Sequence, residues 1–261
     1  MFTKEIDLWG YMFDKVNILG VKISDLTIDE IVELIIESAK KKTGRVLFTP
    51  NSEIIESFRK DKELLSILNS ADILAADGIG VVLAAKILKK PLRGRAAGYD
   101  IAVKLLENAG ELSFYFFGGA PGIAENAKDN LEIKYPEIKI VGTKDGYNYD
   151  DSLPDEIAEK KADIVFVCLG AEKQERWIYE NRERLSDKIL MGVGGSIDVF
   201  SGRVKRAPNF FIKLHLEWLY RLIKQPSRFI RMLALPKFLI AVVLKRLKNA
   251  RGREKVSRIQ R

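Results

Sequence analysis

Short apolar runs alternate with longer segments of helical period through most of the chain. Seven runs rich in Val, Ile and Phe occupy residues 16–23, 45–50, 72–78, 112–119, 138–143, 163–170 and 189–195. Between the first two, residues 27–42 place five apolar side chains on one helix face: Ile28, Ile31, Leu34, Ile35 and Ala39. This order predicts an α/β fold, with a Rossmann-like, mainly parallel sheet covered by helices on both faces.

From Pro208 onward the pattern is helical throughout. In residues 209–224 the polar positions share one helix face and leave the aromatic and aliphatic side chains on the others: Lys213, Glu217, Arg221 and Lys224. We expect the helix to stop at residues 225–227 and again at Pro236, because proline lacks the amide hydrogen that a continuing helix needs.

These two patterns divide the chain into an α/β catalytic body, residues 1–202, and a C-terminal helical appendage that is basic and amphipathic, residues 203–261. The apolar stretch at residues 232–244 contains a proline and a lysine. It also falls short of the roughly 20 residues that a membrane-spanning helix requires.

The formal net charge of +8 on 261 residues is the sum of two unlike parts. Residues 203–261 hold 17 basic and 2 acidic residues, a charge of +15, whereas residues 1–202 hold 27 basic and 34 acidic residues, a charge of −7. A basic appendage suits a polyanionic partner, either nucleic acid or an anionic membrane surface.

The pattern of the appendage separates these two partners. No helix-turn-helix, RNA-recognition or zinc-finger motif is present, whereas helices with Trp, Phe and Leu on one side and Lys or Arg on the other suit a membrane interface. We therefore predict an anionic membrane surface, and not nucleic acid, as the partner. Docking of the helices on the body or on a second subunit stays open, and it can alternate with membrane contact.

The ends of the predicted strands carry the small and polar residues. Ligands of parallel sheets bind beyond the carboxyl ends of the strands, so we expect the site among the segments that follow the runs: Thr49–Asn51, Asp77–Gly78, Gly118–Gly122, Gly170–Gln174 and Gly192–Asp198.

The run FFGGAPGIAENA reads as a strand, a glycine turn and the start of a helix. Amide N–H groups at such a helix start can receive a phosphate, and Gly118 and Gly119 are the candidates for it. The spacing matches neither a dinucleotide fingerprint nor a P-loop. The alternative is that these glycines only let the chain turn tightly.

Asp77 stands at the end of an apolar run and before two glycines. A carboxylate at the edge of an apolar site can have its pKa raised and act as a general base. The alternative is that Asp77 caps the following helix, and the two roles are compatible.

Several chemistries find no support in the chain. The single histidine, His215, reads as a helix-face residue, and the single cysteine, Cys168, lies in an apolar run and excludes an intrachain disulfide. There is no histidine cluster, C-x-x-C, G-x-S-x-G or strand-end Asp-x-Asp pair, and Asp150-Asp151 reads as part of a turn. The N-terminal residues do not read as a secretory signal, so a reducing cytosol is expected.

Six motifs in order resemble one known family: TPNSEI (49–54), ADGIGVV (76–82), FFGGAPG (116–122), LGAEKQERWI (169–178), GVGGSIDVFSGRVKRAP (192–208), and the segment from Leu216 to Arg231. Together they resemble the WecG/TagA/CpsF family of bacterial glycosyltransferases, over residues 16 to about 248. Within that family the likeness is to the N-acetylmannosaminyltransferases of wall teichoic acid linkage-unit synthesis. The segments before residue 16 and after residue 248 lie outside the likeness.

The resemblance implies an inverting transfer of N-acetylmannosamine from its UDP donor to the 4-hydroxyl of GlcNAc on undecaprenyl diphosphate. It implies that no metal or other cofactor is used and that the enzyme is peripheral, at the cytoplasmic face of the cell membrane. Related members transfer N-acetylmannosaminuronate or glucose instead, and no residue here separates these sugars.

The resemblance also implies roles for single residues. Asp77 matches the proposed general base, and the remaining matches are to substrate-binding positions. Of these, Thr49 and Asn51 lie near the sugar and Arg95 beside the donor. Gln174 and Asp198 match the nucleotide pocket. The tail arginines that match residues thought to meet the diphosphate are Arg221, Arg228 and Arg231.

A reaction with a UDP leaving group needs one base and positive charge near the developing phosphate charge. We therefore expect the appendage to fold over the site at the membrane and to bring its arginines to the donor. Two alternatives of other classes remain, namely an enzyme that modifies a nucleotide sugar without a lipid acceptor, and a non-catalytic nucleotide-binding scaffold at the membrane.

Overall fold

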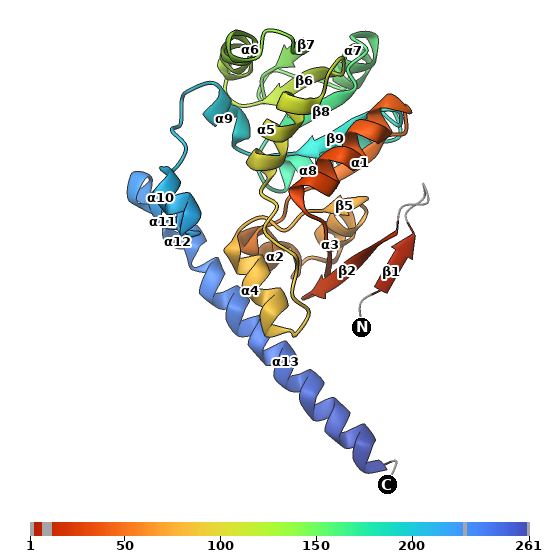
Figure 1. Ribbon diagram of the computed structural model, residues 1–261, viewed down its shortest axis with the longest axis vertical. Coiled ribbons are helices and arrows are strands. Elements are labelled where there is room, and N and C mark those ends of the chain that lie inside the picture. Colours follow the sequence, from red (N-terminus) through yellow and green to blue (C-terminus); the bar gives the residue numbers. More distant parts are fainter. Residues whose placement is uncertain (1–2, 7–11, 227–228, 260–261) are drawn as a thin grey trace.

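The computed structural model describes residues 3–6, 12–226 and 229–259 and contains two β-sheets (Figure 1). The larger sheet has six strands, all parallel to their neighbours. In spatial order they are β5 (Ile73–Leu74), β4 (Arg45–Phe48), β9 (Ile189–Gly192), β8 (Ile164–Cys168), β6 (Ser113–Gly118) and β7 (Lys139–Lys144). The predicted α/β class with a mainly parallel sheet is confirmed.

Helices cover both faces of this sheet. On one face their buried side chains form a cluster with alternate strand residues: α1 (Ile28–Lys40), α5 (Gly98–Asn108), α6 (Ile123–Lys134) and α9 (Ser196–Phe200). On the other face lie α2 (Ser52–Phe58), α3 (Lys62–Asn69), α4 (Ile79–Ile87), α7 (Leu153–Glu159) and α8 (Lys173–Asn181).

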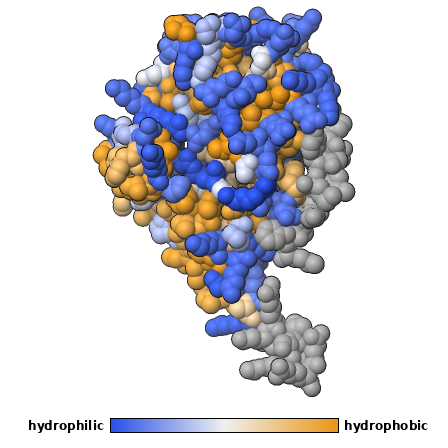
Figure 2. Space-filling view, viewed as in Figure 1, coloured by the Kyte–Doolittle hydropathy of each residue, from blue (hydrophilic) through white to orange (hydrophobic). Residues whose placement is uncertain are grey.

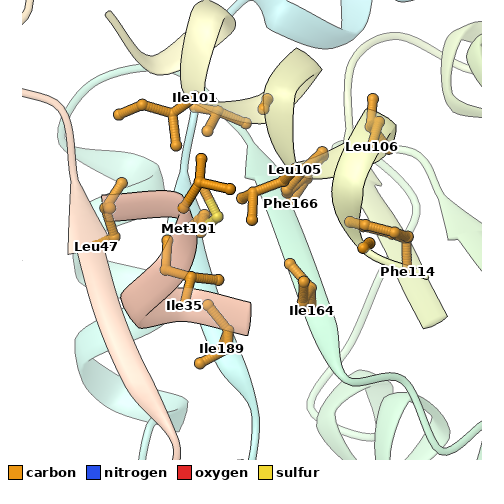
Figure 3. Packing of buried hydrophobic residues seen from close by; sticks show 14 of the residues in the cluster. Ile35, Leu47, Ile101, Leu105, Leu106, Phe114, Ile164, Phe166, Ile189 and Met191 are labelled. Carbon is orange, nitrogen blue, oxygen red and sulfur yellow. The ribbon is translucent and has the colours of Figure 1, made fainter. Parts of the chain in front are cut away.

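The strands divide their side chains between the two clusters with period two. In β6, Phe114 and Phe116 belong to the first cluster and Tyr115 and Phe117 to the second. Figure 3 shows the first cluster, where Met191 of β9 lies between side chains of α1 and α5. The near-continuous apolar runs of the sequence therefore follow from a sheet that is buried on both sides.

The first apolar run, residues 16–23, was expected to be a strand of the parallel sheet, and this prediction is wrong. It contains a hairpin turn that joins β2 (Met12–Ile18) to β3 (Val21–Ser24), and β1 (Thr3–Ile6) completes a separate antiparallel sheet. Leu19 and Gly20 both have positive φ angles, 53° and 103°, as a two-residue hairpin turn requires. The run hid this turn because leucine occupies one of its two positions.

The appendage consists of α10 (Asn209–Lys213), α11 (Glu217–Lys224), α12 (Phe229–Met232) and α13 (Ala234–Ile259). The predicted single helix over 209–224 is interrupted, and His215 lies at the break with a φ of 59° instead of on a helix face. The predicted stop after residue 224 is confirmed. Pro236 does not break a helix as expected, because it lies in the first turn of α13, where the helix needs no amide donor.

α13 runs along α2 and α4 and continues past the body (Figure 1). Phe238 and Val242, one helical turn apart, are fully buried in the second cluster. Gly80 in α4 allows this approach, because a Cβ at that position would lie 2.8 Å from Leu235. Docking of the appendage on the body, which the sequence left open beside membrane contact, is therefore present in this structure.

Candidate active site

The strand-end segments meet along the carboxyl edge of the sheet, and the chain leaves its two central strands toward opposite faces. After β4 it enters α2 on one face, and after the neighbouring β9 it enters α9 on the other. Such a switch point is where ligands of open α/β sheets bind. Thr49, just after β4, donates its hydroxyl hydrogen to the carbonyl oxygen of Gly192 at 3.2 Å and ties the two strands together there.

Asp77 lies just after β5, the edge strand that pairs with β4. It stands beside the loop that follows β4. Its backbone N–H donates to the carbonyl of Pro50 at 3.3 Å, and the neighbouring Ala76 accepts a bond from Ala96 at 2.9 Å, which brings Arg95 close. The residue that begins α4 is Gly78, and no side chain caps that helix. The capping role considered for Asp77 is therefore not the one that the structure shows.

The Asp77 carboxyl has a pKa raised to about 6. Burial is the largest cause, because it disfavours the charged form. The guanidinium groups of Arg221 and Arg95 act in the opposite direction, while Glu217 and Asp100 raise the pKa further. A carboxyl with such a pKa is largely ionised at neutral pH and still basic enough to take a proton, as a general base must be.

Arg95 is held between two carboxylates. It donates to Asp100 at 2.8 Å, and it pairs with Glu217 of α11. Its side chain is only 13% exposed, and burial opposes its charge while Glu217 raises its pKa. Asp100 also pairs with Arg206, so the same carboxylate binds the body and the first residues of the appendage.

The predicted tail arginines differ in their positions. Arg221 is exposed, yet its charge reaches Asp77. Arg231 lies 3.9 Å from Glu53 in the first turn of α2. Arg228 lies outside the described residues. Two of the three predicted arginines are thus found on the side of the site that contains Asp77 and Asn51.

Asn51 caps α2 by accepting hydrogen bonds from the backbone N–H groups of Glu53 and Ile54 at 2.9 and 3.0 Å. Thr49 is buried and packs against Gly98 at the start of α5, where a Cβ would lie 2.8 Å from its hydroxyl oxygen. Thr49 and Asn51 therefore have a structural role, because they fix the positions of α2, α5 and the strand ends beside Asp77.

At the other end of the carboxyl edge of the sheet, where β6 and β8 end, backbone groups form most of the candidate site. Gly118 and Gly119 have φ angles of 130° and 75°, and a Cβ on Gly118 would lie 2.4 Å from the carbonyl oxygen of Cys168. α6 begins after Gly122 without a side-chain cap. These glycines are thus required by the backbone path, and they leave the start of α6 accessible to an anion.

Gln174, in the first turn of α8, is buried and ties that helix to the loop after β9. Its Oε1 accepts a hydrogen bond from the backbone N–H of Gly194 at 3.0 Å, and its Nε2 donates to Glu175 at 2.8 Å. Glu175 in turn accepts from the backbone N–H of Glu172, a residue with a φ of 74°. Burial raises the pKa of Glu175.

Asp198 lies in the first turn of α9, 3.6 Å from Arg203. The adjacent Ile197 packs against Gly119. Asp198 and the glycines of β6 therefore belong to one end of the site, and Asp77 to the other. Cys168 lies between them at the end of β8, and burial raises the pKa of its thiol to about 12, which makes it inert.

Sequence reasoning missed Asp100, Glu217 and Glu175. For Glu217 a signal existed, because it is one of only two acidic residues in the basic appendage. The partners of Asp100 and Glu175 could be seen only once the chain was folded.

Within residues 3–6, 12–226 and 229–259, no group of three or more His, Cys, Asp or Glu side chains is placed to hold a metal ion. In the same residues no helix combines the length and apolarity needed to cross a bilayer.

Comparison with known proteins agrees with the resemblance seen in the motifs. Residues 16–252 match the family described as glycosyl transferase WecG/TagA/CpsF. The N-acetylglucosaminyldiphosphoundecaprenol N-acetyl-beta-D-mannosaminyltransferase of Bacillus spizizenii is 41% identical over 203 residues, 77% of this chain and 79% of the relative. The protein of the same name from Bacillus subtilis is 40% identical, over 80% of this chain and 82% of its own. That of Staphylococcus aureus strain MRSA252 is 35% identical, over 91% and 96%.

Proposed function

This chain belongs to the WecG/TagA/CpsF family of glycosyltransferases, and we propose that it transfers N-acetylmannosamine from UDP-N-acetylmannosamine to the GlcNAc of undecaprenyl-diphosphate-GlcNAc. This is the reaction named for its relatives. In a cell it would contribute to the linkage unit of wall teichoic acid, with inversion to a β-1,4 bond.

One observation carries the chemistry, namely a carboxyl group at the carboxyl edge of the sheet whose pKa is raised by burial, while the charges of Arg95 and Arg221 act against that rise. Asp77 takes the proton of the acceptor 4-hydroxyl as that oxygen bonds to the anomeric carbon. The bond from the anomeric carbon to the UDP oxygen breaks, and its electron pair leaves with UDP. Arg95 and Arg221 are near enough to stabilise the charge that develops there.

The donor is proposed to lie along the edge from Asp77 toward Asp198. Thr49 and Asn51 flank the sugar, and Gln174 fixes the loop after β9 for the nucleotide. Side-chain cations and helix-start N–H groups supply the positive charge, so we propose a reaction that requires no metal ion.

The appendage supports a peripheral position at the cytoplasmic membrane face. Of 15 large apolar side chains described as exposed, ten lie beyond residue 208, among them Phe210, Ile223 and Ile240 at 67%, 62% and 60%. Figure 2 shows hydrophobic surface gathered where α10 and α11 lie and along the first turns of α13. Nearby lysines and arginines complement anionic lipid, and the proposed acceptor is itself a lipid.

A transfer assay tests the proposal. The protein is incubated with UDP-N-acetylmannosamine, UDP-N-acetylmannosaminuronate, UDP-GlcNAc or UDP-glucose, with a lipid-diphosphate-GlcNAc acceptor on anionic vesicles, and with or without EDTA. We expect a β-1,4-linked disaccharide lipid from the first donor alone, and an unchanged rate in EDTA. Donor turnover without acceptor indicates a nucleotide-sugar-modifying enzyme, and binding without turnover indicates a scaffold.

A further inference from the structure

Helix α11 presents two opposite charges to the body, and the body presents two opposite charges to α11. Glu217 and Arg221 are one helical turn apart and so share a face. Glu217 pairs with Arg95, and the charge of Arg221 acts on Asp77. The pair of Glu217 with Arg95 therefore turns toward the Asp77 end of the site the helix face that also carries Arg221.

The body side of this arrangement is fixed. Asp100 in the first turn of α5 binds Arg95 at 2.8 Å, and the Arg95 side chain is nearly buried. Asp100 also pairs with Arg206, whose guanidinium lies over the ring of Tyr99 at 4.5 Å, and Tyr99 stacks on Phe200 at 5.1 Å. Arg95 is thus a rigid point to which a helix can be attached.

α11 itself is held less firmly than Arg95. None of the eight residues of α11 is buried, and Arg221 itself is exposed. The buried contacts of the appendage come later, at Phe238 and Val242. α11 is held instead by contacts at its surface: Tyr220 packs on Phe211 of α10, with 5.4 Å between the ring centroids, and Glu217 pairs with Arg95, whose side chain is only 13% exposed. The pair with Arg95 is the one of these two contacts that joins α11 to the body.

We propose that Glu217 is a positioning residue, which binds Arg95 and thereby holds α11 where Arg221 stands beside Asp77. The inference rests on the proposed function, because it assigns Arg221 a role in the same transfer. Glu217 itself touches no reacting atom. Its carboxylate sets the register of the helix that carries the cation.

The first test is a double-mutant cycle on the transfer rate. Because a displacement of about 1 Å can cost on the order of 100-fold, we expect Glu217→Gln to lower kcat by about 10- to 100-fold, with UDP affinity changed by no more than about twofold. In the Arg221→Ala background the same substitution is expected to have no further effect. Glu217→Asp retains the charge, and its kcat is expected to lie between those of the wild type and Glu217→Gln. The control is Glu183→Gln, an exposed glutamate just after α8 whose carboxylate lies 3.5 Å from the guanidinium of Arg182.

The inference is wrong if Glu217→Gln keeps the wild-type kcat, or if its effect multiplies that of Arg221→Ala. A gain in donor affinity with unchanged kcat would instead identify Glu217 as a carboxylate that competes with the donor phosphate.

A second test does not depend on transfer. Hydrogen exchange of the backbone amides of α11 is expected to be at least about tenfold faster in Glu217→Gln than in the wild type, while that of α4 stays unchanged. Unchanged exchange in α11 overturns the inference even if the enzyme uses another sugar. If exchange in α11 is faster in Glu217→Gln but the wild-type protein transfers no N-acetylmannosamine, Glu217 does hold α11 in place and only the proposed function is rejected.

Discussion

The two ends of the candidate site differ in the chemical groups that form them. Around Asp77 the site consists of side-chain charges, and two of them, Glu217 and Arg221, come from the appendage. Around Gly118 and Gly119 it consists of backbone, closed by the buried amide of Gln174 and supplied by the body alone.

This difference separates binding from chemistry. A backbone site forms together with the sheet that creates it, so under the proposed function the body supplies the end of the site that would hold the nucleotide. A cluster of charges needs counter-charges in fixed positions, and here the counter-charges arrive with α11. Changes in the appendage should therefore affect the reaction far more than nucleotide binding.

The largest effect is expected for Asp77→Asn, which keeps the shape and removes the base. Transfer should fall by about 10²- to 10⁴-fold, while UDP affinity, measured by calorimetry, changes by no more than about twofold. The variant should be no less stable than the wild type at pH 8, because the raised pKa means that the ionised carboxylate opposes folding. Substantial remaining transfer would show that another group is the base.

The next largest effect tests whether the appendage is seated by its buried residues. Phe238→Ala should lower the free energy of unfolding by about 3–5 kcal/mol, because a fully buried ring is lost. Ile240→Ala, two residues away and 60% exposed, should change it by less than about 0.5 kcal/mol. Denaturant titration measures both. Equal effects would mean that α13 does not keep its packed position in solution.

The pH dependence of kcat/KM should follow the ionisation of Asp77, and not that of any group at the backbone end of the site. Its pKa is raised to about 6 and the base must be ionised, so kcat/KM should be nearly constant above about pH 7 and fall about tenfold from pH 7 to pH 5. UDP affinity should not follow this curve. A rate that is flat down to pH 4.5 would contradict the raised pKa.

The smallest effect is expected at the backbone end. Gln174→Ala removes the acceptor of the Gly194 N–H and the donor to Glu175, which should weaken UDP binding by about 3- to 10-fold, in line with one or two hydrogen bonds. The maximal rate at saturating donor should change less than the affinity. A loss of kcat with unchanged affinity would place Gln174 with the chemistry and remove the distinction between the two ends.

The sequence predicted the body better than the appendage, for a physical reason. Strands buried on both faces leave unambiguous apolar runs, and glycines after them mark where the backbone must turn. The hairpin at residues 16–23 was missed because its turn begins with Leu19, a residue that seldom adopts positive φ. The appendage was misjudged at His215 and Pro236 because tertiary packing, and not local preference, decides where its marginal helices end.

The site shows the same division. Asp77 and the glycines follow strand ends and could be found from their place in the pattern, whereas Arg95 lies between α4 and α5 and was identified only through the family resemblance. Glu217 is 122 positions from its partner Arg95, and Asp100 binds both Arg95 and Arg206. Such pairings depend on how the appendage returns to the body, which no local spacing encodes.

The late position of α11 and α13 in the chain also has a consequence for biosynthesis. Domains fold from the N-terminus onward as they are made, so the sheet and its glycine loops can form while the appendage is still being synthesised. Phe238 and Val242 seat the appendage only after nearly all of the body has been translated. Under the proposed function, a nascent chain would therefore form the nucleotide end of the site before the Asp77 end is complete, and transfer to the lipid acceptor would begin only after the first turns of α13 have been made.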